Sequence, residues 1–271
     1  MTSAAGCAGC SAHGVTGLQR LGRGLAADLT VALAGNPNTG KSTLFNTLSG
    51  LRRRVGNWSG TTVSSAEGGF RFRENTYRLV DLPGAYTLLA AGNEEQVTRD
   101  FLLVHDPDAT VVVVDATRLE RTLPLALQIL ELTGRVVVAL NLIDEARATG
   151  LELDRRQLDR ELGVPTVPIA ARTGDGLSEL LAAVESVALG PERPPRTVHA
   201  PGRRTGAAGA DPAVERLAVV LAEELPGVRQ ARWLARRLLD GDPGVTRAIS
   251  EGTLRRELLA QGRRSPAAGS V

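Results

Sequence analysis

The chain has 271 residues, of which 42% are hydrophobic and 23% charged, and its formal net charge is +2. This composition is typical of a soluble globular protein with one large domain or two modest ones, and it excludes a bulk charge that would attract nucleic acid or an anionic membrane. No apolar run approaches the roughly 18–20 residues of a spanning helix. The N-terminus lacks the apolar core of a signal peptide, and two cysteines cannot form a disulfide framework, so we expect a cytoplasmic protein.

The first 27 residues are small, rich in glycine and alanine and without periodicity, so we expect a disordered tail. This tail contains Cys7, Cys10 and His13 in the spacing C-x-x-C-x-x-H. Such a group could bind a soft metal or act in redox chemistry, but the sequence offers no fourth ligand nearby. Unengaged thiols in a flexible tail are the favoured interpretation.

The next stretch, GNPNTGKS at 35–42, fits the phosphate-binding motif G-x-x-x-x-G-K-[ST]. The apolar run at 29–34 predicts a strand before it, and 43–50 predicts a short helix after it, which disfavours a chance glycine-rich turn. Backbone N–H groups and the helix N-terminus would bind an anion there. Lys41 would reach the β- and γ-phosphates, and the Ser42 hydroxyl would bind Mg²⁺. The predicted nucleotide-binding residues of this loop are Gly35, Asn36, Pro37, Asn38, Thr39, Gly40, Lys41, Ser42 and Thr43.

Two stretches that a GTPase requires follow in order. Residues 52–68 are rich in glycine and hydroxyl side chains, which suits a switch segment that orders on the γ-phosphate, with Thr61 or Thr62 binding Mg²⁺. The basic run at 52–54 could neutralise phosphate, but a solvated face is the favoured interpretation. In DLPG, Asp81 could hold Mg²⁺ through water, and the Gly84 N–H could meet the γ-phosphate.

From 28 to 189, short β-rich runs alternate with longer helical segments. This pattern predicts an α/β domain with a doubly wound, mostly parallel sheet, whose ligand lies beyond the carboxyl ends of the strands. The runs VVVV and VVVAL are typical of central strands covered on both faces. The predicted strands are 29–34, 67–72, 77–80, 110–114, 135–140 and 166–169, and the predicted helices are 94–103, 120–132, 154–162 and 177–187.

The motif NLID follows one of these strands and predicts selection of guanine. Asp144 could accept hydrogen bonds from N1–H and N2–H₂ of guanine, and facing adenine it would be left unpaired. Asn141 would brace the loop and the base. Leu142 stands where GTPases usually have lysine, so a charge is lost there. The backbone of Ala170 and Ala171 is predicted to meet the guanine carbonyl oxygen.

The segment 190–210 is rich in proline, glycine and arginine, which predicts a linker. After it, 211–260 predicts a small helical subdomain with helices at 212–225, 228–239 and 245–260. The tail 261–271 is predicted to be disordered.

With these motifs in hand, the chain resembles the cytosolic GTPase module of the ferrous iron transport protein B (FeoB) family. The resemblance rests on GNPNTGKSTLFN, VGNWSGTTV, DLPGAYTL, DATRLERTLPLALQILEL and ALNLIDEA, and it covers 29–187. The segment ARWLARRLLDGDP is similar to that family's helical subdomain, which modulates GDP retention.

The resemblance implies GTP/GDP, Mg²⁺ and K⁺ as cofactors. The family's K⁺-binding asparagine falls on Asn38 and its switch threonine on Thr62, while Ala85 stands where Ras-like enzymes have the glutamine that orients water. A monovalent cation could then replace part of an arginine finger. The implied catalytic residues are Lys41, Thr62, Gly84 and Asn38, and the implied metal ligands are Ser42, Thr62 and Asp81 for Mg²⁺ and Asn38 for K⁺.

The resemblance also implies a membrane transport domain as partner, at the inner face of the cell membrane, and a slow intrinsic GTPase. That domain follows the module in the family and is lacking here, so a fragment, a split gene product and a stand-alone relative stay open. A nucleotide sensor with negligible turnover is one alternative. A ribosome-associated GTPase is another, which the near-neutral charge disfavours, so we expect no nucleic-acid partner. A homo-oligomer is compatible with the sequence.

Overall fold

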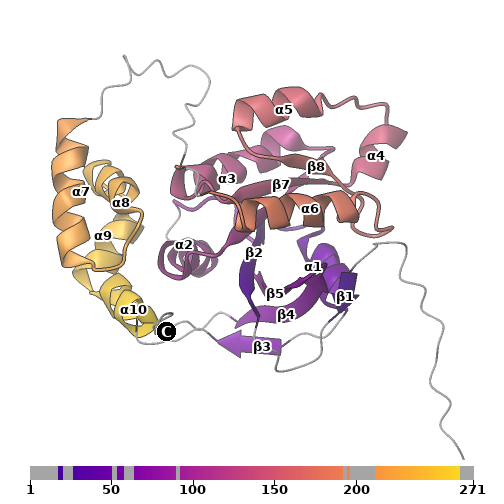
Figure 1. The fold of residues 1–271 in the computed structure, drawn as a ribbon. Coiled ribbons are helices and arrows are strands. Elements are labelled where there is room, and N and C mark those ends of the chain that lie inside the picture. Colours follow the sequence, from indigo (N-terminus) through magenta and orange to yellow (C-terminus); the bar gives the residue numbers. More distant parts are fainter. Residues whose placement is uncertain are drawn as a thin grey trace, which may run out of the picture.

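The computed structural model describes residues 18–20, 27–50, 54–57, 64–89, 92–191, 194–195 and 211–262. Within these residues a sheet carries helices on both faces, and a group of four helices lies beside it (Figure 1). The strands are β1 (Leu18–Arg20), β2 (Leu29–Gly35), β3 (Arg54–Asn57), β4 (Ser64–Phe72), β5 (Asn75–Asp81), β6 (Ala109–Asp115), β7 (Val136–Asn141) and β8 (Thr166–Pro168).

The described strands form one sheet in the order β1-β4-β5-β2-β6-β7-β8, with β3 paired to β4. The pairs from β5 to β8 are parallel, whereas β1, β3 and β5 each pair with β4 in the antiparallel direction. Because parallel strands end at one edge of the sheet, the loops after β2, β5, β7 and β8 gather there. The predicted α/β fold with a mostly parallel sheet is confirmed.

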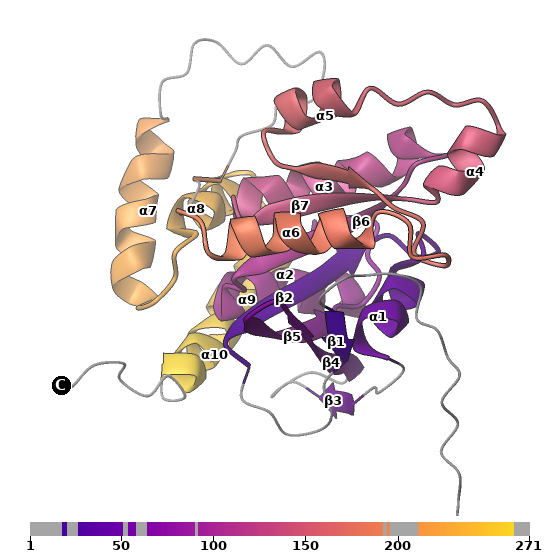
Figure 2. The same cartoon turned by 45° about the vertical axis from the view of Figure 1, so that its right-hand side comes forward.

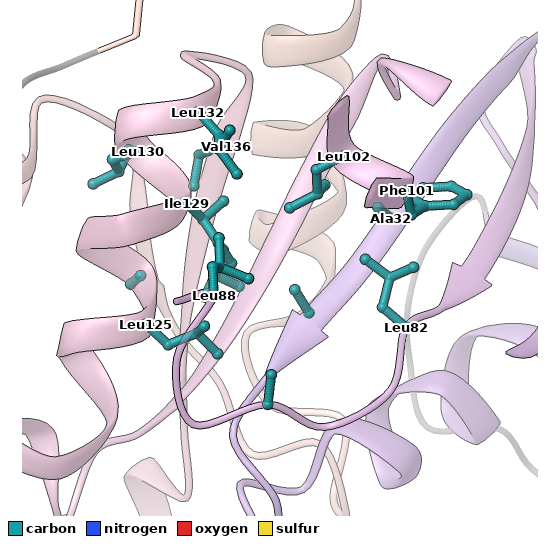
Figure 3. Packing of buried hydrophobic residues seen from close by; sticks show 14 of the residues in the cluster. Ala32, Leu82, Leu88, Phe101, Leu102, Leu125, Ile129, Leu130, Leu132 and Val136 are labelled. Atoms are coloured by element: carbon teal, nitrogen blue, oxygen red, sulfur yellow. The ribbon is translucent and has the colours of Figure 1, made fainter. Parts of the chain in front are cut away.

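Two apolar layers hold the sheet between its helices. Every residue of β6 is buried, as its unbroken valine run predicts. Alternate residues face opposite layers: Val112 and Val114 join one cluster, Val111 and Val113 the other. The first cluster packs under α2 and α3 (Figure 3), and the second under α1 and α6. The helices of this part are α1 (Lys41–Ser49), α2 (Asn93–His105), α3 (Leu119–Leu132), α4 (Ile143–Ala148), α5 (Arg155–Leu162) and α6 (Leu177–Ala188).

The four C-terminal helices pack against α2 and α3. They are α7 (Pro212–Glu224), α8 (Ala231–Leu239), α9 (Pro243–Ser250) and α10 (Thr253–Gly262). Asp211 and Asp242 cap α7 and α9 by accepting backbone N–H bonds, and a proline follows each cap. Trp233, Leu234 and Val245 belong to the same apolar cluster as α3. Figure 2 shows α10 beside α2, although the two helices are far apart in the sequence.

Three predictions of local structure were wrong. The tail expected to be disordered contains β1, which exists because Leu18–Arg20 pairs with the edge of β4. The single helix expected at 245–260 is in fact two helices. Gly252 adopts φ 66°, a left-handed conformation that ends α9 and changes the direction of the chain before α10. Helix α10 also continues to Gly262, past the predicted start of the C-terminal tail.

Candidate functional site

The phosphate-binding motif forms the loop between β2 and α1. Gly40 is the N-cap directly before α1 and lies in the left-handed region, with φ 82°, which glycine adopts without strain. A Cβ on Gly35 would lie 2.6 Å from the carbonyl oxygen of Val113, so the loop passes too close to β6 for any side chain there. Thr39 Oγ1 donates to the Asn36 carbonyl over 2.9 Å and closes the turn. The glycines and the N-terminus of α1 therefore produce an anion-binding concavity.

Lys41 and Asp81 meet at this loop. Lys41 opens α1, Asp81 ends β5, and the Lys41 ammonium donates to the Asp81 carboxylate. The two side chains are only 10% and 11% exposed, so the pair is largely shielded from water. The residue predicted to bind phosphate and the one predicted to hold Mg²⁺ are thus direct neighbours.

Three further side chains at the phosphate end are open to solvent. Ser42, Thr43 and Asn38 are exposed, and Asn38 has φ 67°, a conformation that asparagine tolerates better than most residues. The Ser42 hydroxyl and the Asp81 carboxylate are hard oxygen donors of the kind that Mg²⁺ takes, and the Asn38 amide oxygen is suited to a monovalent cation. The described residues thus offer two oxygen donors suited to Mg²⁺ and one that could take part in binding K⁺.

The loop after β5 closes over the phosphate loop. A Cβ on Gly84 would lie 3.3 Å from Pro37 Cγ, and Ala85 N–H donates to the Gly35 carbonyl over 3.3 Å. The same loop is tied to the helices behind it. Thr98 Oγ1 on α2 donates to the Pro83 carbonyl over 3.1 Å, and Gln128 Oε1 on α3 accepts from Leu88 N–H over 2.6 Å. A shift of the DLPG loop would therefore move against α2 and α3.

Asn141 joins three loops at the other end of the site. Its Nδ2 donates to the Thr39 carbonyl over 2.8 Å, and its Oδ1 accepts from Ala171 N–H over 3.0 Å. A Cβ on Gly40 would lie 2.2 Å from Asn141 Nδ2, so glycine is required beneath this amide. Asn141 is 1% exposed, so these bonds are fully internal. The predicted brace of the base loop is therefore also a brace of the phosphate loop.

Asp144 lies at the start of α4, after Leu142, whose φ of 62° turns the chain into that helix. Arg172, directly after Ala170 and Ala171, places its guanidinium 3.6 Å from the Asp144 carboxylate. Sequence reasoning missed Arg172, although its position next to two predicted base contacts was a usable signal. It also missed that both amide atoms of buried Asn36 have no hydrogen-bond partner among the described residues.

Most predicted site residues come together at this edge of the sheet. Those of the phosphate loop, DLPG, NLID and the Ala170–Ala171 pair lie on the loops after β2, β5, β7 and β8. Thr61 and Thr62, the arginines at 52 and 53, and the Cys7, Cys10 and His13 group lie outside the described residues. Their roles stay predictions.

Comparison with known proteins agrees with this geometry. The family model described as ferrous iron transport protein B matches residues 29–184. The Fe(2+) transporter FeoB of Salmonella choleraesuis (strain SC-B67) is 40% identical over 218 residues, which are 79% of this chain and 27% of that relative. The chain thus spans about a quarter of the length of the curated relatives it matches, 27% for this one.

Solved structures extend the likeness to the helical portion. The cytosolic domain of L. pneumophila FeoB is 32% identical, with a TM-score of 0.70, over 84% of this chain and 88% of that one. The cytosolic domain of the T. maritima FeoB iron transporter in its GMPPNP form is 34% identical, with a TM-score of 0.67, over 89% and 88%. The fold is an α/β P-loop GTPase domain followed by a helical portion. Among the described residues, no helix combines the length and apolar character needed to cross a bilayer.

Proposed function

The chain belongs to the ferrous iron transport protein B family, and from that premise we propose that it is a GTP-binding and GTP-hydrolysing switch module of a ferrous iron uptake system. The observation that carries the proposal is the pair of bonds made by Asn141. They hold the phosphate loop and the Ala171 backbone in one rigid frame, so a bound nucleotide would be held at both ends. Such pre-organisation lowers the entropy cost of binding.

Guanine is selected at the Asp144 end. The carboxylate would accept from N1–H and N2–H₂ of guanine, and the Ala170 and Ala171 backbone would meet the carbonyl oxygen. Adenine offers an acceptor where guanine offers N1–H, so ATP would leave the base-facing lone pairs of the Asp144 carboxylate without a donor. The Asn141 brace fixes these groups relative to the phosphates.

The phosphate end would carry the chemistry. Lys41 would exchange its bond to Asp81 for the β- and γ-phosphates, and the freed Asp81 carboxylate would join Ser42 and Thr62 around Mg²⁺. Mg²⁺ supplies charge neutralisation of the transferred phosphoryl group when it is bound. Gly84 N–H would meet the γ-phosphate and couple its presence to the DLPG loop. Gly35, Asn36, Pro37, Thr39, Gly40 and Thr43 would complete the backbone cradle.

The position directly after DLPG offers no side chain that could orient water, because it is Ala85. We infer that Asn38 would hold K⁺ beside the phosphates, where the ion would supply positive charge. Turnover would be slow without a partner. The likeness to full-length Fe(2+) transporters supports a membrane transport domain as that partner, with the module at the inner face of the membrane.

Steady-state GTP hydrolysis in KCl and in NaCl at equal ionic strength tests the proposal, with ATP as the nucleotide control. We expect hydrolysis of GTP only, with K⁺ stimulation of about tenfold or more. Asn38→Ala should abolish the stimulation. Because alanine is strained at φ 67°, Asn38→Gly is the matched variant, which removes the amide and keeps the backbone.

The outcomes separate the two main functions. Stimulation that both variants lose supports the cation-assisted switch. GTP binding with equal, negligible turnover in both salts contradicts it and favours a nucleotide sensor that acts by binding a partner. Absence of GTP binding overturns both.

A further inference from the structure

We propose that Arg172 supplies to the guanine end of the site the cation that the NLID motif lacks at Leu142, and so slows nucleotide dissociation. The proposal rests on the proposed function, since it assigns a further nucleotide-binding residue to the same site. Its starting observation is the approach of Arg172 Nη2 to within 3.6 Å of Asp144 Oδ2.

Backbone hydrogen bonds on either side of the site fix the position of the Arg172 backbone. Ala171, its neighbour, donates its N–H to the buried Asn141 side chain and accepts a bond from Thr47 Oγ1 over 3.0 Å. Ile143 N–H donates to the Ile169 carbonyl over 3.2 Å, which ties the loop after β7 to the loop after β8. Arg172 therefore starts from an anchored peptide and faces a carboxylate on a loop bonded to its own.

The neighbouring residues Leu142 and Arg147 do not place a cation beside Asp144. Leu142 precedes Asp144 by two residues but carries no charge, and its left-handed φ is set by the turn into α4. Arg147 on α4 pairs instead with Asp175, over 3.2 Å. The Arg172 side chain is 81% exposed and Asp144 is 35% exposed, so the guanidinium is free to lie along a base held by that carboxylate.

Arg172 and guanine can use Asp144 at the same time. A carboxylate offers about four lone-pair positions, and two hydrogen bonds from guanine would take one on each oxygen. The second position on Oδ2 is left for the guanidinium. The planar guanidinium also stacks well on an aromatic face, which an ammonium or an aliphatic chain does less well. Arg172 would thus hold the carboxylate and cover the base together.

Dissociation of a fluorescent GDP analogue tests this assignment. We expect Arg172→Ala to raise the dissociation rate about three- to tenfold, the range of an exposed ion pair combined with a cation–π contact. The effect should shrink as salt rises. Leu142→Lys should have little effect in the wild-type chain but should restore slow dissociation in Arg172→Ala, because it replaces the missing cation from the other loop.

The control is Arg156→Ala on α5, an exposed arginine with the same change in charge. It should leave dissociation unchanged. An unchanged or slower rate in Arg172→Ala, or failure of Leu142→Lys to rescue it, overturns the assignment. Asp144→Asn distinguishes failure of the proposed function from failure of the role assigned to Arg172. If the wild-type chain binds no guanine nucleotide, or binds it independently of Asp144, the proposed function fails. If binding depends on Asp144 and ignores Arg172, only this inference fails.

Discussion

Helix α2 has two contrasting sides. Toward the sheet it contributes Phe101 and Leu102 to an apolar layer whose members are almost completely buried (Figure 3). Toward the C-terminal helices it carries Arg99 and Asp100, which are joined by a 3.0 Å bond from Arg99 Nε to Asp100 Oδ1. Arg99 is 1% exposed, and its Nη1 has no partner among the described residues. Helix α2 therefore carries a buried apolar side and a charged side that contains the Arg99–Asp100 pair.

The charged side responds to protons, whereas the apolar side cannot. Burial raises the pKa of Asp100, and the neighbouring Arg99 partly opposes that change. Burial, together with the charge of Asp100, raises the pKa of Glu257 on α10 to about 7. Helix α2, which is bonded to the DLPG loop through Thr98, therefore also carries the charged pair. Its apolar side supplies buried surface, and its charged side supplies an interaction that changes with pH.

The largest expected effect lies on the apolar side. Ile129→Ala removes a fully buried side chain of α3 and should lower the free energy of unfolding by about 3–4 kcal/mol, through lost burial and the cavity left behind. Urea titration measures the change. Leu259→Ala, on the exposed surface of α10, is the control and should change stability by less than about 0.5 kcal/mol. A loss for Ile129→Ala that depends on pH would contradict the assignment of this side as purely apolar.

The second-largest effect is expected when the Arg99–Asp100 pair on the charged side of α2 is broken. Arg99→Met keeps the length of the side chain but leaves Asp100 without its cation, which should cost about 2–3 kcal/mol at pH 8. The loss should become smaller as the pH falls, because the pKa of Asp100 is raised and its carboxylate takes up a proton more readily than an exposed one. Adding Asp100→Asn should recover most of the stability at pH 8. If the double variant is no more stable than Arg99→Met, the contact is not electrostatic.

The contrast also explains what the sequence could predict. Strands β2, β6 and β7 and helix α3 were found because their apolar patterns follow from burial in the sheet. Strand β1 has no such pattern and depends on pairing with β4. The α9–α10 break was hidden because both helices keep apolar residues facing the same cluster, and only the φ of Gly252 separates them. Helix α4 was missed because it has only six residues and begins within the NLID motif, at Ile143.

The residues of the candidate site also fall into a predictable and an unpredictable group. Phosphate-loop residues were predictable because they are contiguous and the loop between a strand and a helix explains them. The link from Asn141 to Thr39, 102 residues away, and the Lys41–Asp81 pair are long-range contacts that no local pattern encodes. The charge of Arg172 was visible, but its direction toward Asp144 was not. Local chemistry was predictable, and the contacts that position it were not.

A smaller effect should appear in the pH dependence of stability. The pKa of Glu257 is raised to about 7 in the folded chain, from 4.5 as its ordinary value, so folding favours the protonated form. Its stabilising contribution is complete below pH 4.5 and is lost as the pH rises through about 7. Since Glu257 is partly exposed, we expect about 1 kcal/mol. Glu257→Gln should therefore be the more stable protein at pH 8 and show a flatter profile from pH 5 to 8, whereas exposed Glu223→Gln on α7 should follow the wild type.

The smallest expected effect reports how tightly the charged side of α2 packs against α9. A Cβ on Gly244, near the start of α9, would lie 2.6 Å from Arg99 Nη1, so Gly244→Ala must displace a buried guanidinium. Alanine also favours the helix by about 0.5–1 kcal/mol, so the two terms nearly cancel in the wild-type chain.

In the Arg99→Met background the clash with Nη1 is absent, whereas the 3.3 Å approach of the new Cβ to Asp242 Oδ1 is common to both backgrounds. Gly244→Ala should then stabilise the protein by up to about 1 kcal/mol. The difference between the two backgrounds, measured by urea titration at one pH, isolates the contact between Arg99 and Gly244. Equal effects in both backgrounds would mean that the guanidinium moves aside freely. Helix α2 would then be held to the C-terminal helices by its apolar residues alone, and the charged side could not couple the DLPG loop to them.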